Sequence, residues 1–372
     1  MSHLIYGMAN RLWEREIIEM DIVDILKDAL NKGASDIFII AGTSIAYRLS
    51  GKIVHAGDNI LYGDDTKKLV RQIYDIAALE HVNIDELKTE QDFSFSLAGY
   101  GRFRANVYKQ RGSIAAVLRN VMFDLPNPKE LNIPDSIINL AELNKGIVLV
   151  TGSAGSGKST TLTCMLDRIN STMSKHIITL EDPIEYLHKH KQSIISQREI
   201  EVDAKDYANA LRAALRQAPD VILVGEMRDF DAINIAMTAA ETGQLVLSTL
   251  HTIGAANTID RVIDVFPSIQ QHQIRIQLSM VLQAVVSQQL IPGVDGNLVP
   301  AFEIMLANNA IRTMIREEKT HQIDTIIQSS DGMQTMDTDI LRLYKEGKIN
   351  EANAITFASN PELMKKRILA IK

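Results

Sequence analysis

The chain has 372 residues, of which 46% are hydrophobic and 23% charged, and its formal net charge is −7. This length is too great for one hydrophobic core, and the composition is that of an ordinary globular protein. The acidic balance disfavours nucleic acid as a partner, because proteins that bind a phosphate backbone usually present a basic surface. The single cysteine, Cys164, excludes an internal disulfide and a zinc site built from cysteines. We find no run of about 18 apolar residues, so no membrane-spanning helix is expected.

The first part of the chain predicts a small α+β domain after a leader of residues 1–19. Helices are expected at 20–33 and 64–80, where apolar residues recur at helical spacing. Alternating polar and apolar residues predict strands at 36–41, 45–49, 52–55, 93–97, 102–108 and 113–120. The predicted domain therefore spans residues 20–120. Pro126, Pro128 and Pro134 lie in a stretch without helical or strand periodicity, which predicts a short linker over 121–136.

The rest of the chain, residues 137–372, is predicted to be a second domain. From about residue 145 it has the alternating β and α pattern of a parallel sheet covered on both faces. Apolar strands are expected at 146–151, 176–181, 221–226 and 245–250, and helices at 158–171, 205–217 and 229–242. Beyond about residue 304 the pattern is helical, with segments at 308–317, 320–329, 336–346, 350–357 and 361–371. The sequence thus predicts an α/β fold with a helical C-terminal region.

The segment Gly152-Ser-Ala-Gly-Ser-Gly-Lys-Ser159 matches the G-x-x-x-x-G-K-[ST] pattern of P-loop NTPases, with an apolar strand before it and a helix after it. Glycines let backbone N–H groups turn toward phosphates. Lys158 is expected to reach the β- and γ-phosphates, and Ser159 to bind Mg²⁺. The predicted cofactors are therefore ATP and Mg²⁺. The residues predicted to contact the nucleotide are Gly152, Ser153, Ala154, Gly155, Ser156, Gly157, Lys158, Ser159 and Thr160.

Carboxylates follow two other predicted strands. One strand ends in Gly225 and Glu226, a Walker B pattern in which glycine replaces the usual aspartate. The other ends in Glu181, Asp182 and Glu185, and acids so close together repel one another unless a cation lies among them. Glu226, with Glu185, is expected to activate the attacking water. The predicted magnesium ligands, some acting through water, are Ser159, Glu181, Asp182 and Glu185. A solvent-exposed acidic loop is the alternative interpretation of the segment 181–185.

Four segments together resemble the type II/type IV secretion ATPase superfamily: 152–159, 181–185, 224–229 and 247–252. The resemblance is strongest to the retraction ATPases of type IV pili and extends over about residues 20–345. It implies a RecA-like ATPase domain, a PAS-like N-terminal domain and a homohexameric ring. It also implies a motor for pilus depolymerisation and twitching motility at the cytoplasmic face of the membrane. Its partners would be the inner-membrane platform protein and the rest of the pilus machinery.

Further roles follow from positions that match this family. His251 would sense the state of the γ-phosphate. Arg102, Arg104 and Arg119 would present guanidinium groups to the nucleotide or to a subunit interface, where they can stabilise charge on the transferred phosphoryl group. Gln244 departs from the family, which usually has a second histidine there, and glutamine cannot take up a proton near neutral pH. Three more arginines near the acidic segments are expected to bridge phosphates and acids: Arg212, Arg216 and Arg228.

The segment Ala310-Ile-Arg-Thr-Met-Ile-Arg-Glu317 resembles a C-terminal signature of the same family. Its apolar residues Ile311, Met314 and Ile315 recur at i, i+3 and i+4, which predicts one apolar stripe on a helix. The stripe has two interpretations, the core of the protein or a contact with the membrane platform.

Other functions stay open beside pilus retraction. Pilus assembly ATPases typically carry a tetracysteine zinc motif, which this chain cannot form, so no zinc is expected. Secretion or conjugation ATPases of the Dot/Icm type lack that motif and remain an alternative. A recombinase or helicase of the RecA type should present basic DNA-binding loops, and the acidic net charge disfavours it. A nucleotide switch without hydrolysis is disfavoured by the presence of both Glu226 and Glu185.

Overall fold

The structure, a computed structural model, describes residues 21–49, 51–79, 82–87, 89–121, 125–227 and 229–371. The predicted leader of residues 1–19 and residues 122–124 of the predicted linker lie outside these ranges. The chain divides into two compact units, Met1–Met122 and Phe123–Lys372. Within the described ranges, no helix is both long and apolar enough to cross a membrane.

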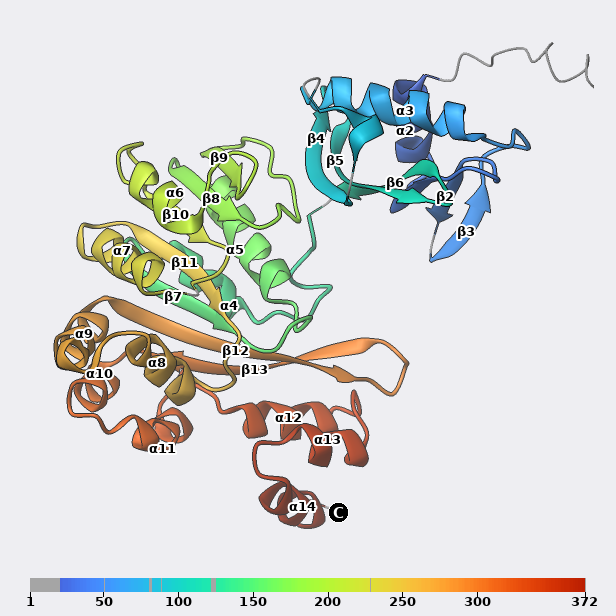
Figure 1. Ribbon diagram of the computed structural model, residues 1–372. Helices are drawn as coiled ribbons and strands as arrows, with labels where there is room; N and C mark the ends of the chain where they lie inside the picture. Colours follow the sequence, from blue (N-terminus) through green and yellow to red (C-terminus); the bar gives the residue numbers. More distant parts are fainter. Residues whose placement is uncertain are drawn as a thin grey trace, which may run out of the picture. The chain divides into compact units, whose positions relative to one another are not determined.

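The first unit is a six-stranded antiparallel sheet with two helices packed against one face (Figure 1). The strand order is β3-β2-β1-β6-β5-β4. The elements are α2 (Ile22–Asn31), β1 (Asp36–Ile39), β2 (Ala46–Leu49), β3 (Lys52–His55), α3 (Gly63–Ile76), the 3-10 turn η2 (Ile84–Glu86), β4 (Gln91–Leu97), β5 (Gly101–Gln110) and β6 (Ser113–Val121). Phe103, Ala105 and Val107 of β5 pack in the core with the helices. Because side chains alternate along a strand, Arg102 and Arg104 lie on the opposite face of the sheet.

The second unit contains a seven-stranded sheet in the order β13-β12-β7-β11-β10-β8-β9. Its strands are β7 (Gly146–Thr151), β8 (His176–Glu181), β9 (Ile194–Glu199), β10 (Val221–Val224), β11 (Leu245–Leu250), β12 (Leu282–Pro292) and β13 (Leu298–Leu306). All neighbouring strands are parallel except β12 and β13, which form an antiparallel hairpin. The strands predicted for a parallel sheet, which correspond to β7, β8, β10 and β11, are parallel, and the hairpin β12–β13, which was not predicted, makes the sheet mixed.

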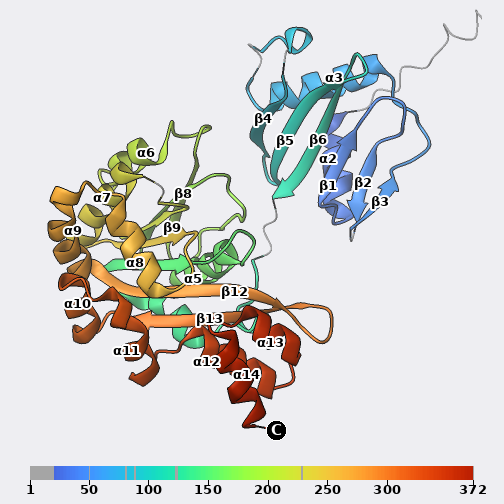
Figure 2. The same ribbon diagram turned by 60° about the horizontal axis from the view of Figure 1, so that its bottom comes forward.

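Helices cover both faces of this sheet (Figure 2). Along β7, Ile147 and Leu149 pack in one apolar cluster, and Val148 and Val150 in another. The first cluster includes residues of α6 (Tyr207–Ala214), α7 (Phe230–Glu241), α8 (Ala255–Asp264), α9 (Ser268–Val281), α10 (Asn309–Arg316) and α11 (Ile323–Ser329). The second includes residues of α4 (Asp135–Ile138), the 3-10 turn η3 (Asn139–Glu142) and α5 (Lys158–Thr172). A strand buried on both faces reads as a continuous apolar run, as β7 does.

The C-terminal segment is helical, as predicted. After α11 it comprises α12 (Met336–Lys345), α13 (Glu351–Phe357) and α14 (Pro361–Leu369), and the short 3-10 turn η4 (Thr320–Gln322) precedes α11. Helices α12–α14 form their own apolar cluster with Ile291 and Ala301 of the β12–β13 hairpin. Ile311 and Ile315 of α10 are 0% exposed and belong to the main core. The core interpretation of the 310–317 stripe is therefore confirmed for these two residues, which cannot contact a membrane platform.

Candidate nucleotide-binding site

The glycine-rich loop 152–157 connects strand β7, inside the sheet, to the N-terminus of α5. Gly157 immediately precedes Lys158 and has φ +88°, in the left-handed region that favours glycine. The backbone angle therefore favours glycine, and a Cβ atom at Gly157, which would lie 2.8 Å from Gln288 Nε2, would also displace this amide. The loop therefore places the first amide groups of α5, with the positive end of the helix dipole, at the carboxyl end of β7.

Lys158 is the first residue of α5, and its side chain folds back over the loop. Its Nζ donates hydrogen bonds to the carbonyl oxygens of Gly152 (3.0 Å) and Ser153 (2.9 Å). Burial lowers the pKa of Lys158, while the nearby carboxylates of Glu226 and Glu185 act in the opposite direction. The ammonium group is thus held beside the loop and close to two acids.

Glu226 and His251 follow the ends of neighbouring parallel strands, β10 and β11. Thr249 Oγ1 donates a hydrogen bond to Gly225 O (2.6 Å), and Ser248 Oγ donates one to Val224 O (2.7 Å), which ties the two strand ends together. His251 Nε2 lies 3.2 Å from Glu226 Oε1. Glu226 is mostly buried, whereas the His251 side chain is 50% exposed, so the imidazole forms the accessible side of the pair.

Glu181, the last residue of β8, is partly buried at the carboxyl ends of the parallel strands, where Glu226 and His251 also lie. Its Oε1 accepts hydrogen bonds from Thr179 Oγ1 (2.5 Å) and Gln197 Nε2 (3.2 Å). Burial raises the pKa of Glu181 to about 7, although these two hydrogen bonds favour the ionised form. Asp182 and Glu185, which follow in the next turn, are exposed.

One cavity of about 260 Å³ brings these residues together. It is lined by Ala154, Gly155, Lys158 and Ser159 from the loop and helix, by Glu181, Asp182 and Glu185 from the segment after β8, and by Tyr207, Gly225, Glu226, Thr249 and His251. Among the residues predicted to bind nucleotide or metal, those named here share a single cavity. Gly157 and Thr160 instead line a larger cavity of about 650 Å³ that borders the same loop, together with Thr161, Gln288, Leu290, Leu298 and Val299.

The smaller cavity suits a magnesium–phosphate complex better than a bare metal ion. Its oxygen ligands, the hydroxyl of Ser159 and the carboxylates after β8, are of the type that Mg²⁺ prefers. Within the described ranges, no group of three or more His, Cys, Asp or Glu side chains converges closely enough to hold a metal ion by itself. Mg²⁺ is usually bound by one or two carboxylates together with water and substrate phosphates, so the residues present fit this role.

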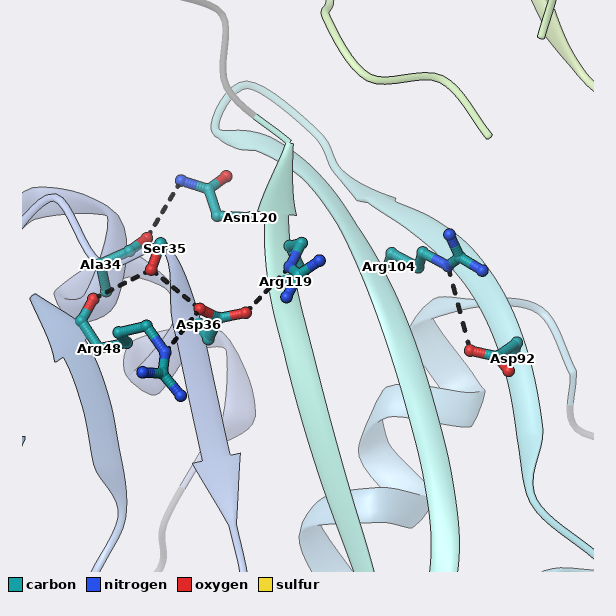
Figure 3. A network of polar contacts seen from close by, with 8 residues as sticks. All are labelled: Ala34, Ser35, Asp36, Arg48, Asp92, Arg104, Arg119 and Asn120. Atoms are coloured by element: carbon teal, nitrogen blue, oxygen red, sulfur yellow. Dashed lines mark hydrogen bonds and ion pairs between the residues drawn. The ribbon is translucent and has the colours of Figure 1, made fainter. Parts of the chain in front are cut away.

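Arg104 and Arg119 lie on the helix-free sheet face of the first unit (Figure 3), and Arg102 lies on the same face as Arg104 because side chains alternate along β5. Arg119 Nε lies 3.0 Å from Asp36 Oδ1, and Arg48 Nε lies 3.1 Å from Asp36 Oδ2. Arg104 lies beside Arg119 in the β5–β6 register, and its Nε is 4.0 Å from Asp92 Oδ1. Arg102 Nη1 donates to Ser96 Oγ (3.3 Å). These arginines belong to a different unit from the cavity, so their action on a nucleotide stays a prediction.

The other three predicted arginines have separate outcomes. Arg212 Nη2 lies 3.6 Å from Asp231 Oδ2, which is an ion pair on the surface of α6 and α7. Arg216 is exposed. Arg228 lies outside the described residues.

Comparison with known proteins decides the family. The model of the type II/IV secretion system protein family matches residues 12–297. The chain belongs to this family. The type IV pilus retraction ATPase PilT of Pseudomonas aeruginosa is 43% identical over 345 residues, which cover 92% of this chain and 99% of that protein. A twitching motility protein of Neisseria gonorrhoeae is 48% identical over 278 residues, 74% of each protein.

A solved structure of the same family supports the α/β fold. The crystal structure of the pilus retraction motor PilT with bound ADP has a TM-score of 0.82 and 45% sequence identity. The similarity covers 94% of this chain and 100% of that one. This type II/IV secretion system protein therefore shares its fold with a relative whose crystal structure contains a bound nucleotide.

Two residues at the site were not predicted from the sequence of this chain. Gln288 of β12 is 3% exposed and lies beneath the glycine-rich loop, where its Oε1 accepts a hydrogen bond from Thr161 Oγ1 (2.7 Å). Tyr207 lines the smaller cavity from the start of α6. Neither residue had a signal in the sequence, because no strand was predicted at 282–292 and Tyr207 is one position among others of the helix expected at 205–217.

Proposed function

We propose that this chain is a Mg²⁺-dependent ATPase motor that powers the retraction of type IV pili. The observation that carries the proposal is the arrangement around one cavity of the Lys158 loop, the carboxylates after β8 and the Glu226–His251 pair. Similarity to PilT over nearly the full length of both chains supports retraction as the process that ATP drives.

The proposal gives each residue of the loop a part in binding ATP. Backbone N–H groups of residues 152–157 and the N-terminus of α5 bind the phosphates, as in P-loop NTPases. The Nζ of Lys158 exchanges the carbonyl oxygens of Gly152 and Ser153 for phosphate oxygens. The base and ribose occupy the larger cavity, whose wall includes the apolar side chains of Leu290, Leu298 and Val299. Such a cavity, largely apolar with a few polar groups, is typical of small-ligand sites.

Hydrolysis requires a base beside the terminal phosphate, and Glu226 is the proposed one. Its carboxylate is mostly buried and lines the phosphate cavity, so it can accept a proton from the attacking water. Glu185 lines the same cavity and assists. Mg²⁺, held by the Ser159 hydroxyl and by Glu181, Asp182 and Glu185 in part through water, would neutralise charge on the phosphates. His251, in contact with Glu226, would register the loss of the γ-phosphate and transmit it to α8.

The proposal assigns the larger architecture from the family. Residues 20–120 form a PAS-like domain, residues 121–136 a linker, and residues 137–372 a RecA-like P-loop ATPase domain that ends in the helical segment from about residue 304. Six copies form a ring in which Arg102, Arg104 and Arg119 act at the nucleotide or at a subunit interface. The ring works at the cytoplasmic face of the membrane with the inner-membrane platform protein and the pilus machinery.

Labelled pili on living cells test this function directly. Deletion of the gene is expected to leave long, static pili, and the intact chain is expected to restore retraction. A chain with Glu226→Gln, expressed at the same level, should not restore it. Loss of pili on deletion would indicate an assembly ATPase instead, and unaltered pili would indicate another secretion system.

A further inference from the structure

Gly225 occupies the position at which most P-loop enzymes have the Walker B aspartate. The structure leaves little space there for a side chain. A Cβ atom at Gly225 would lie 2.9 Å from Tyr207 Oη, 3.1 Å from Leu180 O and 3.4 Å from Glu181 Cα. The space beside the end of β10 that a longer side chain would enter is thus already occupied, and the atom closest to it is a phenol oxygen.

Tyr207 is fixed in this position by its place in the fold. It is the first residue of α6, and the preceding residue, Asp206, caps the helix by accepting a hydrogen bond from Asn209 N (2.8 Å). The Tyr207 ring packs on the main apolar core, next to the sheet. Its hydroxyl lies beside Gly225, which follows the end of β10, and the residue lines the cavity with Glu181 and Glu226.

We propose that the Tyr207 hydroxyl replaces the missing aspartate side chain, as a positioning residue that hydrogen-bonds the water shell of the Mg²⁺ ion bound with the nucleotide. An ionised aspartate can only accept hydrogen bonds, whereas a phenol both accepts and donates. The hydroxyl can therefore order a water molecule, or a carboxylate of the cavity, without adding negative charge. The charge that an aspartate would supply is left to Glu181 and Glu226, which line the same cavity.

The inference depends on the proposed function, because it assumes that Mg²⁺ and nucleotide bind together in this cavity. Its test is therefore a binding measurement and not only a rate. The affinity for a fluorescent, non-hydrolysable ATP analogue is measured in Mg²⁺ and in EDTA, and the ratio of the two affinities is the gain due to Mg²⁺. The intact protein must show such a gain, and its absence would contradict the proposed function itself.

Tyr207→Phe removes only the hydroxyl and keeps the ring in the core. The Mg²⁺ gain is expected to fall by about fivefold, the effect of one hydrogen bond, while the affinity in EDTA stays unchanged. Tyr344→Phe, a phenol of α12 that packs in the C-terminal cluster, is the matched control and should keep the full gain. A folded Tyr207→Phe protein with the full gain, beside an intact protein that shows one, overturns this inference alone.

A second variant tests the replacement itself. Combining Tyr207→Phe with Gly225→Asp removes the closest obstacle and restores the usual aspartate. A folded double variant is expected to recover the Mg²⁺ gain, and one whose gain stays at the level of Tyr207→Phe contradicts the equivalence of the two groups. If the double variant does not fold, Tyr207→Phe alone decides the inference.

Discussion

The partly buried carboxyl of Glu181 gives a sharp prediction for the protein without nucleotide. Its pKa of about 7 in the folded chain lies above the ordinary value of 4.5 that applies after unfolding. Between these two pH values the folded chain holds a proton that the unfolded chain has released. The contribution of Glu181 to stability therefore falls as the pH rises from about 4.5 to about 7, and it stays low above that range.

The gap between the two pKa values corresponds to about 3 kcal/mol of lost stability at high pH. Glu181→Gln removes the ionisation and keeps an oxygen that can accept the hydrogen bond from Thr179. At about pH 5 most of the penalty is absent even in the unchanged protein. The substitution is therefore expected to raise the free energy of unfolding by about 2 kcal/mol more at about pH 8 than at about pH 5.

Urea unfolding at the two pH values measures this difference. Glu241→Gln, on the exposed end of α7, is the control and should have the same small effect at both. Saturating Mg·ATP supplies a cation near the carboxylate, so it should reduce or reverse the advantage of Glu181→Gln. An equal effect of Glu181→Gln at both pH values would refute the assignment of Glu181 as a carboxyl that burial keeps protonated.

Four other substitutions test the packing of the second unit, around the site and in the core. Gln288→Leu and Thr161→Val each leave one buried polar group without its partner, so each should lower the free energy of unfolding in urea by about 1–3 kcal/mol. The double variant should lose clearly less than the sum of the two losses, and strict additivity would exclude the contact. Gly157→Ala, at φ +88° and 2.8 Å from Gln288 Nε2, is expected to weaken ATP binding at least tenfold, measured by titration, with Gly243→Ala as a control in open space. Ile311→Asp places a charge in the core and should lower the free energy of unfolding by several kcal/mol. A variant that stays fully stable and still supports retraction would contradict the burial of Ile311.

Much of the sheet could be predicted because its strands are short apolar runs bounded by glycines, acids or polar residues. The strands predicted at 146–151, 176–181 and 245–250 coincide with β7, β8 and β11. Several residues that line the smaller cavity follow directly after such runs. Parallel strands place their carboxyl ends at one edge, so local patterns were sufficient to bring Lys158, Glu226 and His251 to the same region.

The hairpin β12–β13 had no comparable signal. Helix α9 ends at Val281 and β12 begins at Leu282, with no glycine or proline between them. The polar run Ser287-Gln-Gln289 also lies inside β12, although polar runs are more typical of loops. Gln288 meets Thr161 across a sequence separation of 127 residues, and only the packed sheet creates that contact.

The contact between Tyr207 and Gly225 is of the same kind. A helix was expected at 205–217, but no periodicity indicates that the first residue of that helix reaches the end of another strand. The glycine itself was visible in the sequence as a departure from the Walker B pattern. The close approach of Tyr207 Oη and Leu180 O, which favours glycine there, is a property of the packing and was not visible in the sequence.

The central claim is that this site hydrolyses ATP with Glu226 as the base. Its most direct test is to measure phosphate release from Mg·ATP by the purified protein and by Glu226→Gln, at equal saturation with nucleotide. The account predicts that the unchanged protein hydrolyses ATP, and that the variant binds ATP normally but turns it over about a hundred- to ten-thousand-fold more slowly. A protein that is inert toward Mg·ATP in every oligomeric state, or a Glu226→Gln variant with unchanged turnover, would contradict it.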